Sequence, residues 1–148
     1  MVFPLLAAGC KGVRALGTPP RPRPDVAVLD DAITAEKLMI ARYHAAISGS
    51  PAQAAFLTPL LAQHQEHAAR LTSRLVNPRP ASPAPASSPT ATPQAPTLTA
   101  LQAAEEDAAD ALVRHLAEVT PSLAQLLASI AASEASHAQL LQSRGGTG

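Results

Sequence analysis

Residues 121–144, PSLAQLLASIAASEASHAQLLQSR, form the stretch of sequence that decides the fold class. Leucine and isoleucine recur every three or four residues, which is the period of a helix with one buried face. Glu134 and His137 interrupt this apolar stripe near its middle. Thr120-Pro121 is a typical helix start, and Gly145-Gly146 is a typical stop. We therefore predict an amphipathic helix with an acid and a histidine three residues apart on its apolar face.

Three further segments repeat this pattern. We predict helices over residues 25–48, 51–76 and 97–119, each with an apolar stripe at helical spacing. A side chain that can bind metal interrupts every stripe: Glu36 in the first segment, His64 and His67 in the second, and Glu105 in the third. The chain is therefore predicted to be all-α, with four helices arranged as two hairpins.

Prolines mark the boundaries between these elements. Seven of the fifteen prolines lie in residues 77–96, among Ala, Ser and Thr, and predict a semi-rigid, extended, Pro-rich linker. Pro59 lies inside the second predicted helix instead. There it either kinks the helix or marks its true start, with Thr58 as the N-cap.

The composition excludes several classes of function. Eleven basic and eleven acidic residues leave a net charge of zero, so no basic surface for nucleic acid is expected. Only 2% of the residues are aromatic, which argues against a surface that stacks on bases or sugars. The single cysteine excludes an intramolecular disulfide and a CxxC site. Any chemistry must therefore rest on the acids and the five histidines.

Position along the helices indicates that the side chains that interrupt the apolar stripes lie close together. A buried charge costs several kcal/mol unless it is paired or binds a cation. Measured from the expected hairpin turns near Ser50 and Thr120, the interruptions lie 14–17 residues along each helix. At 1.5 Å per residue this is about 21–25 Å, so all of them fall in one layer. The interval from Glu36 to His64 is 28 residues, and that from Glu105 to Glu134 is 29, which predicts a pseudo-two-fold bundle with a metal centre on its axis.

This arrangement resembles the ferritin-like superfamily, whose four-helix bundles carry a Glu on two helices and a Glu-x-x-His motif on the other two. The long linker agrees, because such bundles join their second and third helices by a lengthwise crossover. The resemblance implies a site for one or two transition-metal ions with these ligands: Glu36, His64, His67, Glu105, Glu134 and His137. Iron is the metal that it favours, with Zn, Mn or Cu as alternatives.

His64 departs from the family pattern, because the family usually has Glu at this position. The resemblance implies oxidation of a metal by dioxygen or peroxide, as in a ferroxidase-like di-metal centre. Two alternatives stay open. One is a metal-binding or metal-sensing module without catalysis, which the extra histidine favours. The other is a structural helical lipoprotein in which buried Glu and His satisfy one another. A homodimer is also left open, and no nucleic acid partner is expected.

Residues 1–24 are predicted to precede the bundle of residues 25–148. Leu5–Cys10 resembles the end of a bacterial lipoprotein signal, in which Cys10 would be lipidated, and residues 11–24 resemble a Pro-rich tether. Ala7 stands where the pattern prefers Leu, Val or Ile, and nine residues are too few for a full signal. Either the true start lies upstream or the match is chance. The resemblance implies an outward-facing envelope protein with a membrane anchor; the alternative is a cytoplasmic protein.

The remaining polar residues on the helices are expected to lie outside the centre. Glu106, Asp107 and Asp110 form a solvated face, and His44 and His115 are boundary or surface residues. Tyr43 is expected to be a core residue with a hydrogen-bonded hydroxyl group.

Overall fold

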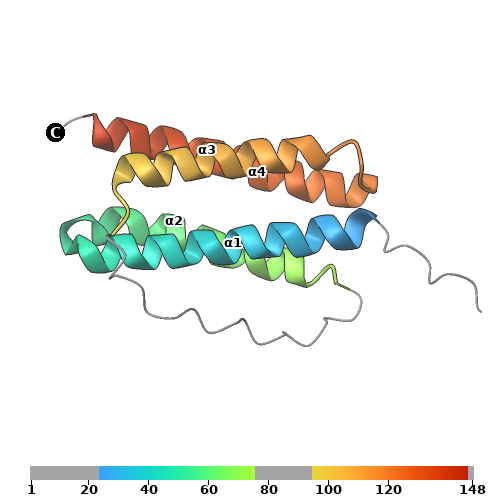
Figure 1. Cartoon of the computed structure of the whole chain (residues 1–148), viewed down its shortest axis with the longest axis horizontal. Coiled ribbons are helices and arrows are strands. Elements are labelled where there is room, and N and C mark those ends of the chain that lie inside the picture. The colour runs from blue at the N-terminus through green and yellow to red at the C-terminus, as the bar shows by residue number, and fades with distance from the viewer. Residues whose placement is uncertain (1–23, 76–94, 147–148) are drawn as a thin grey trace, which may run out of the picture.

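A computed structural model describes residues 24–75 and 95–146 of the chain (Figure 1). Within these ranges it contains no strand, so the all-α prediction is confirmed. The elements are α1 (Pro24–Gly49), a 3-10 turn (Pro51–Gln53), α2 (Ala54–Thr72), α3 (Leu98–His115) and α4 (Pro121–Gly145). None of these helices combines the length and apolar character needed to cross a membrane.

The helices pair as two hairpins, α1 with α2 and α3 with α4 (Figure 1). Arg74, just after α2, shares a cavity with Asp25 and Thr120 at one end of the bundle. Ala95, just before α3, lies beside Gly49 at the opposite end. The end of α2 and the start of α3 therefore lie at opposite ends of the bundle, as a ferritin-like topology requires. The predicted linker itself, apart from its last two residues, lies outside the described part of the chain.

The core consists of two apolar clusters with a polar layer between them. The cluster near the start of α1 includes Leu29, Leu71 and Leu127, and the cluster near its end includes Leu57, Leu101 and Leu141. The six predicted site residues occupy the intervening level of the helices. Apolar packing therefore shields the polar layer from water at both ends.

Helix ends differ from the predictions in several places. The second helix was expected over residues 51–76 but ends at Thr72, where the chain tightens into three-residue turns. Because α2 begins at Ala54, the alternative start at Pro59 is wrong, and the Thr58 hydroxyl instead donates to the Ala54 carbonyl over 2.7 Å. The third helix ends at His115 rather than residue 119, and the backbone after it forms three-residue turns, in which the Leu116 N–H donates to the Val113 carbonyl over 3.2 Å.

Thr120 occupies the predicted N-cap position of α4, but its side chain makes no cap hydrogen bond. Its hydroxyl donates to Asp25 Oδ2 over 2.8 Å, and its backbone N–H donates to Asp25 Oδ1 over 3.1 Å. The first turn of α1 is therefore tied to the α3–α4 turn, which links the two hairpins at this end.

Gly49 is required by close packing at the other end of the bundle. A Cβ atom on Gly49 would lie 2.2 Å from the Cβ of Ala95, whereas one on Gly145 would meet only Leu98 Cβ at 4.0 Å. Gly49→Ala should therefore destabilise the protein by about 1–3 kcal/mol, the usual effect of overpacking. Gly145→Ala is the matched control, because Gly145 also ends its helix. Urea unfolding tests this prediction, and equal effects of the two substitutions would contradict it.

Candidate metal centre

All six predicted site residues lie together in the buried layer of the bundle. Glu36 comes from α1, His64 and His67 from α2, Glu105 from α3, and Glu134 and His137 from α4. Residues three apart on a helix share a face. His64 and His67 therefore point inward together, and so do Glu134 and His137. Their exposed fractions range from 0% to 8%, which places ionisable groups in a layer with almost no water contact.

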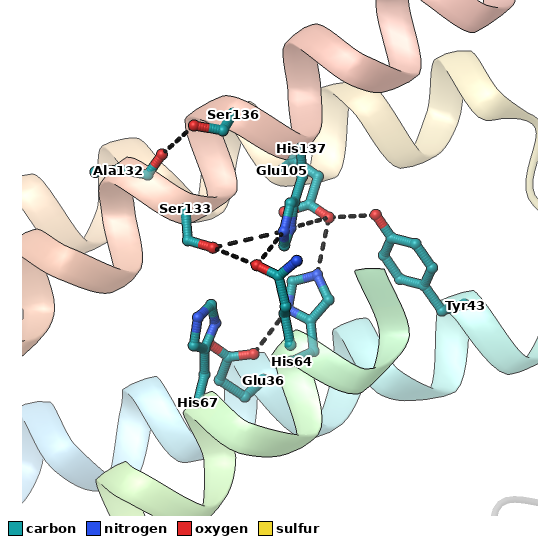
Figure 2. A network of polar contacts seen from close by, with 10 residues as sticks. Glu36, Tyr43, His64, His67, Glu105, Ala132, Ser133, Ser136 and His137 are labelled. Atoms are coloured by element: carbon teal, nitrogen blue, oxygen red, sulfur yellow. Dashed lines mark hydrogen bonds and ion pairs between the residues drawn. The ribbon is translucent and has the colours of Figure 1, made fainter. Parts of the chain in front are cut away.

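His64 connects the two hairpins through both of its ring nitrogens (Figure 2). Nδ1 lies 2.8 Å from Glu36 Oε2, and Nε2 lies 2.8 Å from Glu105 Oε1. Burial alone would lower the pKa of His64, but hydrogen bonds to Glu105 and Glu36 outweigh it and raise the pKa to about 9. In the metal-free protein His64 is therefore an imidazolium between two carboxylates at neutral pH.

The carboxylates on either side of His64 are held ionised. Burial would raise the pKa of Glu105, but hydrogen bonds to His137 and His64 outweigh it and lower the pKa to about 2. The pKa of Glu36 is also lowered, because interactions with His64 and His67 outweigh the effect of burial. The Nδ1 atom of His67 lies 3.2 Å from Glu36 Oε1.

Glu134 has the opposite environment. Burial and then the negative charges of Glu36 and Glu105 raise the pKa of Glu134 to about 8. A carboxyl group that resists ionisation beside two carboxylates is the arrangement that a bound cation would relieve.

Five polar atoms in this layer are buried without a hydrogen-bond partner among the described residues. They are Glu36 Oε1, Glu105 Oε2, Glu134 Oε2, His67 Nδ1 and His137 Nδ1. Leaving a buried polar atom unsatisfied costs about 1–3 kcal/mol, so five in one place need an explanation. His67 Nδ1 lies 3.2 Å from Glu36 Oε1 and His137 Nδ1 lies 3.5 Å from Glu105 Oε1, but neither contact has full hydrogen-bond geometry. Pairing of buried Glu with His therefore accounts for His64 and only in part for these atoms.

The donor atoms fall into two overlapping sets. Glu36, His64, His67 and Glu134 form one, and His64, Glu105 and His137 form the other, each with ligand atoms within 4.8 Å of one another. The ring of His64 is 5.2 Å from that of His137 and 5.8 Å from that of His67, measured between centroids. Imidazole nitrogen with carboxylate oxygen is the donor set of Fe, Zn, Mn and Cu sites in proteins. The residues present therefore fit transition-metal ions.

Comparison with known families agrees with this geometry. A sequence model of the ferritin-like domain matches residues 24–146, which span both hairpins and the crossover. The chain belongs to the ferritin-like family. The predicted ferritin-like bundle is thereby confirmed. No curated protein and no solved structure matches the chain.

The site of this ferritin-like domain also includes polar residues that the sequence pattern did not predict to belong to it. Gln63 Oε1 lies 3.1 Å from His137 Nε2 and accepts a 3.1 Å hydrogen bond from Ser133 Oγ. When Nε2 donates to Gln63, the lone pair of His137 is left on Nδ1, the nitrogen that faces the cluster. Gln63 is exposed and immediately precedes His64, off the apolar stripe, so helical periodicity gave no signal for it.

Tyr43 is fully buried, and its hydroxyl donates to Glu105 Oε1 over 2.5 Å. Burial and then the charge of Glu105 raise the pKa of Tyr43, which keeps the phenol protonated. The expectation of a core tyrosine with a hydrogen-bonded hydroxyl is confirmed, and its acceptor is a predicted ligand.

The side chains predicted to lie outside the centre do so. Glu106, Asp107, Asp110 and His44 are exposed. His115 is half-buried and lies 3.2 Å from Glu118. Cys10 lies outside the described residues, so its lipidation stays a prediction.

Gln63→Leu should weaken metal binding, because it removes the acceptor that orients His137. The loss of such an outer partner typically lowers metal affinity by about 10–100-fold. Gln63→Glu should retain affinity, since a carboxylate also accepts from Nε2. Gln65→Leu, at an exposed position two residues away, is the control. Competitive titration with a chromogenic chelator measures all four affinities, and equal effects of the two leucine substitutions would contradict the prediction.

Proposed function

We propose that this ferritin-like domain binds one or two transition-metal ions, iron foremost, through Glu36, His64, His67, Glu105, Glu134 and His137. The observation that carries the proposal is the set of five buried donor atoms, from five of these residues, without hydrogen-bond partners in the described chain. Cations held by the two overlapping donor sets would give these atoms partners and offset the charge of the carboxylates. Zinc, manganese and copper are alternatives with the same donors.

We further propose oxidase or ferroxidase-like chemistry at this centre. Bound iron would supply the electrons that reduce dioxygen or peroxide. The protein's part is to hold three carboxylates and three imidazoles in one dry layer, with apolar clusters on both sides. The Tyr43 hydroxyl fixes the orientation of Glu105 through its hydrogen bond to Oε1.

Metal analysis of the full chain, purified without chelator and after reconstitution with Fe(II), tests the binding. We expect at least one equivalent of tightly bound metal, and its loss in the variant Glu36→Ala/Glu134→Ala. Glu106→Ala is the control, because Glu106 is adjacent to Glu105 but exposed. A reconstituted protein without bound metal would rule out the proposal and leave a structural bundle.

A second candidate is a metal-binding or metal-sensing module without turnover. It is favoured by His64, because an imidazole in place of a carboxylate leaves the site with one negative charge fewer for two ions. Oxygen consumption with added Fe(II) separates the candidates. Faster consumption by the wild type than by Glu36→Ala/Glu134→Ala supports the oxidase, whereas equal rates with metal bound support the module.

We also propose that the domain is anchored to the outer face of a cell membrane through lipidated Cys10. The support is the sequence Leu5–Cys10 and the Pro-rich segment after it. Detergent phase partitioning of the protein expressed from its own gene, with the upstream start included, tests this. Cys10→Ala should move the protein to the aqueous phase, and a wild type that is already aqueous would refute the anchor.

A further inference from the structure

A cavity of about 80 Å³ lies in the seam between α1 and α3, where the two hairpins meet. Its lining includes both Glu36 and Glu134, which are 2% and 3% exposed. Three other cavities, at the two ends of the bundle and on the outer face of α3 and α4, include none of the six candidate ligands. The seam cavity therefore connects to the candidate metal centre, and those three do not.

Alanines make the walls of this cavity. Ala32 and Ala35 lie three residues apart on α1, and Ala108 and Ala111 do the same on α3, so each pair occupies one face of its helix. Ala32 is buried, Ala108 and Ala111 are half-buried, and Ala35 is exposed. The side chains stop at Cβ, so the seam keeps an open space that larger residues would fill.

The cavity runs from the surface to two of the buried candidate ligands. At its outer side lie the exposed Asp31 and the half-buried His115. At its inner side lie Glu36 and Glu134, each with one carboxylate oxygen that has no hydrogen-bond partner in the described chain. A molecule that enters through the seam therefore reaches the first of the two donor sets directly.

Size and polarity limit what can enter. A water-sized molecule needs about 10–15 Å³ of such volume, so about five to eight would fill the cavity. The walls between mouth and floor are alanine, valine and leucine, which offer no hydrogen bonds to the hydration shell of an ion. An uncharged molecule of two or three atoms loses little on entering.

We propose that the alanine-lined seam is the entry route by which a small uncharged oxidant, of the size of dioxygen, reaches the metal centre. This inference rests on the proposed function and adds the route by which its oxidant reaches the site. Ala111 and Ala108 are the residues that set the width of the route.

Xenon tests the seam without depending on metal, because small apolar cavities bind it. Crystals of the metal-free protein pressurised with xenon should show it between α1 and α3, and crystals of Ala111→Leu should not. The control is Ala103→Leu, at an exposed position on the same helix. Wild-type crystals without xenon in the seam would overturn the proposal.

Nitric oxide, an uncharged diatomic ligand of Fe(II), tests the route in the loaded protein. In stopped-flow mixing, Ala111→Leu and Ala108→Leu should slow its association at least about tenfold, an added barrier of about 1.4 kcal/mol. Ala103→Leu should match the wild type, and bound iron should be equal in all four proteins. Unchanged rates with full iron content would overturn the route and leave the metal site standing. A protein that binds no iron would refute the proposed function, and the xenon result would then decide whether the seam admits a small molecule.

Discussion

Glu105→Gln is expected to destabilise the metal-free protein by about 3 kcal/mol at pH 7, near the low end for removing one partner of a buried ion pair. Glu105 is fully buried and lies 2.8 Å from the Nε2 atom of the His64 imidazolium. Glutamine keeps the shape and an acceptor for the Tyr43 hydroxyl, but it removes the charge. Glu36 still pairs with His64, which limits the loss.

The pH dependence of this effect distinguishes a lost charge from altered packing. His64 has a pKa of about 9, so at pH 10 its ring is mostly neutral and Glu105 has lost this cationic partner. The cost of Glu105→Gln should therefore shrink or change sign at pH 10. Urea unfolding in the presence of chelator measures it, with Glu106→Gln as an exposed control within about 0.5 kcal/mol of the wild type. An equal cost at both pH values would contradict the explanation.

The metal-free protein is also expected to lose stability as the pH rises from 5 to 9.5, by about 3 kcal/mol through His64 and by a further loss of similar size through Glu134. The pKa of His64 is raised to about 9, so its contribution is complete below its unfolded value near 6.5 and is lost as the pH passes 9. The pKa of Glu134 is raised to about 8, so its protonated form also stabilises the fold, and this contribution is lost as the pH rises through 8. Both groups hold protons in the folded protein that the unfolded chain releases.

The two carboxylates that pair with His64 do not reverse this trend. Glu36 and Glu105 have lowered pKa values, so their contributions persist throughout this range and are lost only in acid. The ionisable groups that face the layer from the four helices are Glu36, Tyr43, His67, Glu105, Glu134 and His137.

Urea midpoints at pH 5, 7 and 9.5 test the prediction, with His64→Gln/Glu134→Gln as the variant that should show a flatter profile. Stability that increases from pH 5 to 9.5 would contradict it. Bound metal should reverse the slope, because a ligating histidine must first lose its proton.

Much of the fold followed from apolar periodicity. Stripes such as Leu123, Leu127 and Ile130 predicted α4, and Thr120-Pro121 and Gly145 marked its ends, because helix period and capping are local properties. The ends of α2 and α3 were predicted too far along the chain. Where a helix stops beside a turn depends on how the chain reverses, and periodicity does not contain that information.

The site was predictable for a different reason. A charged residue on a buried stripe is rare unless it has a partner, so Glu36, Glu105 and the two x-x-His pairs stood out against an Ala- and Leu-rich background. Gln63 could not be found this way, because it is exposed and lies beside the stripe. Its role depends on His137, 74 residues away.

The sequence by itself determined that four amphipathic helices carry six acids and histidines at one depth, because side-chain chemistry and helical spacing are written along the chain. Only the tertiary structure decided how those groups share charge. Both nitrogens of His64 face carboxylates from opposite hairpins, which leaves five other donor atoms without hydrogen-bond partners among the described residues. Only the packing of α1 against α3 opened an alanine seam to Glu36 and Glu134. Distances between helices set pKa values and cavities, and no local pattern in the chain specifies those distances.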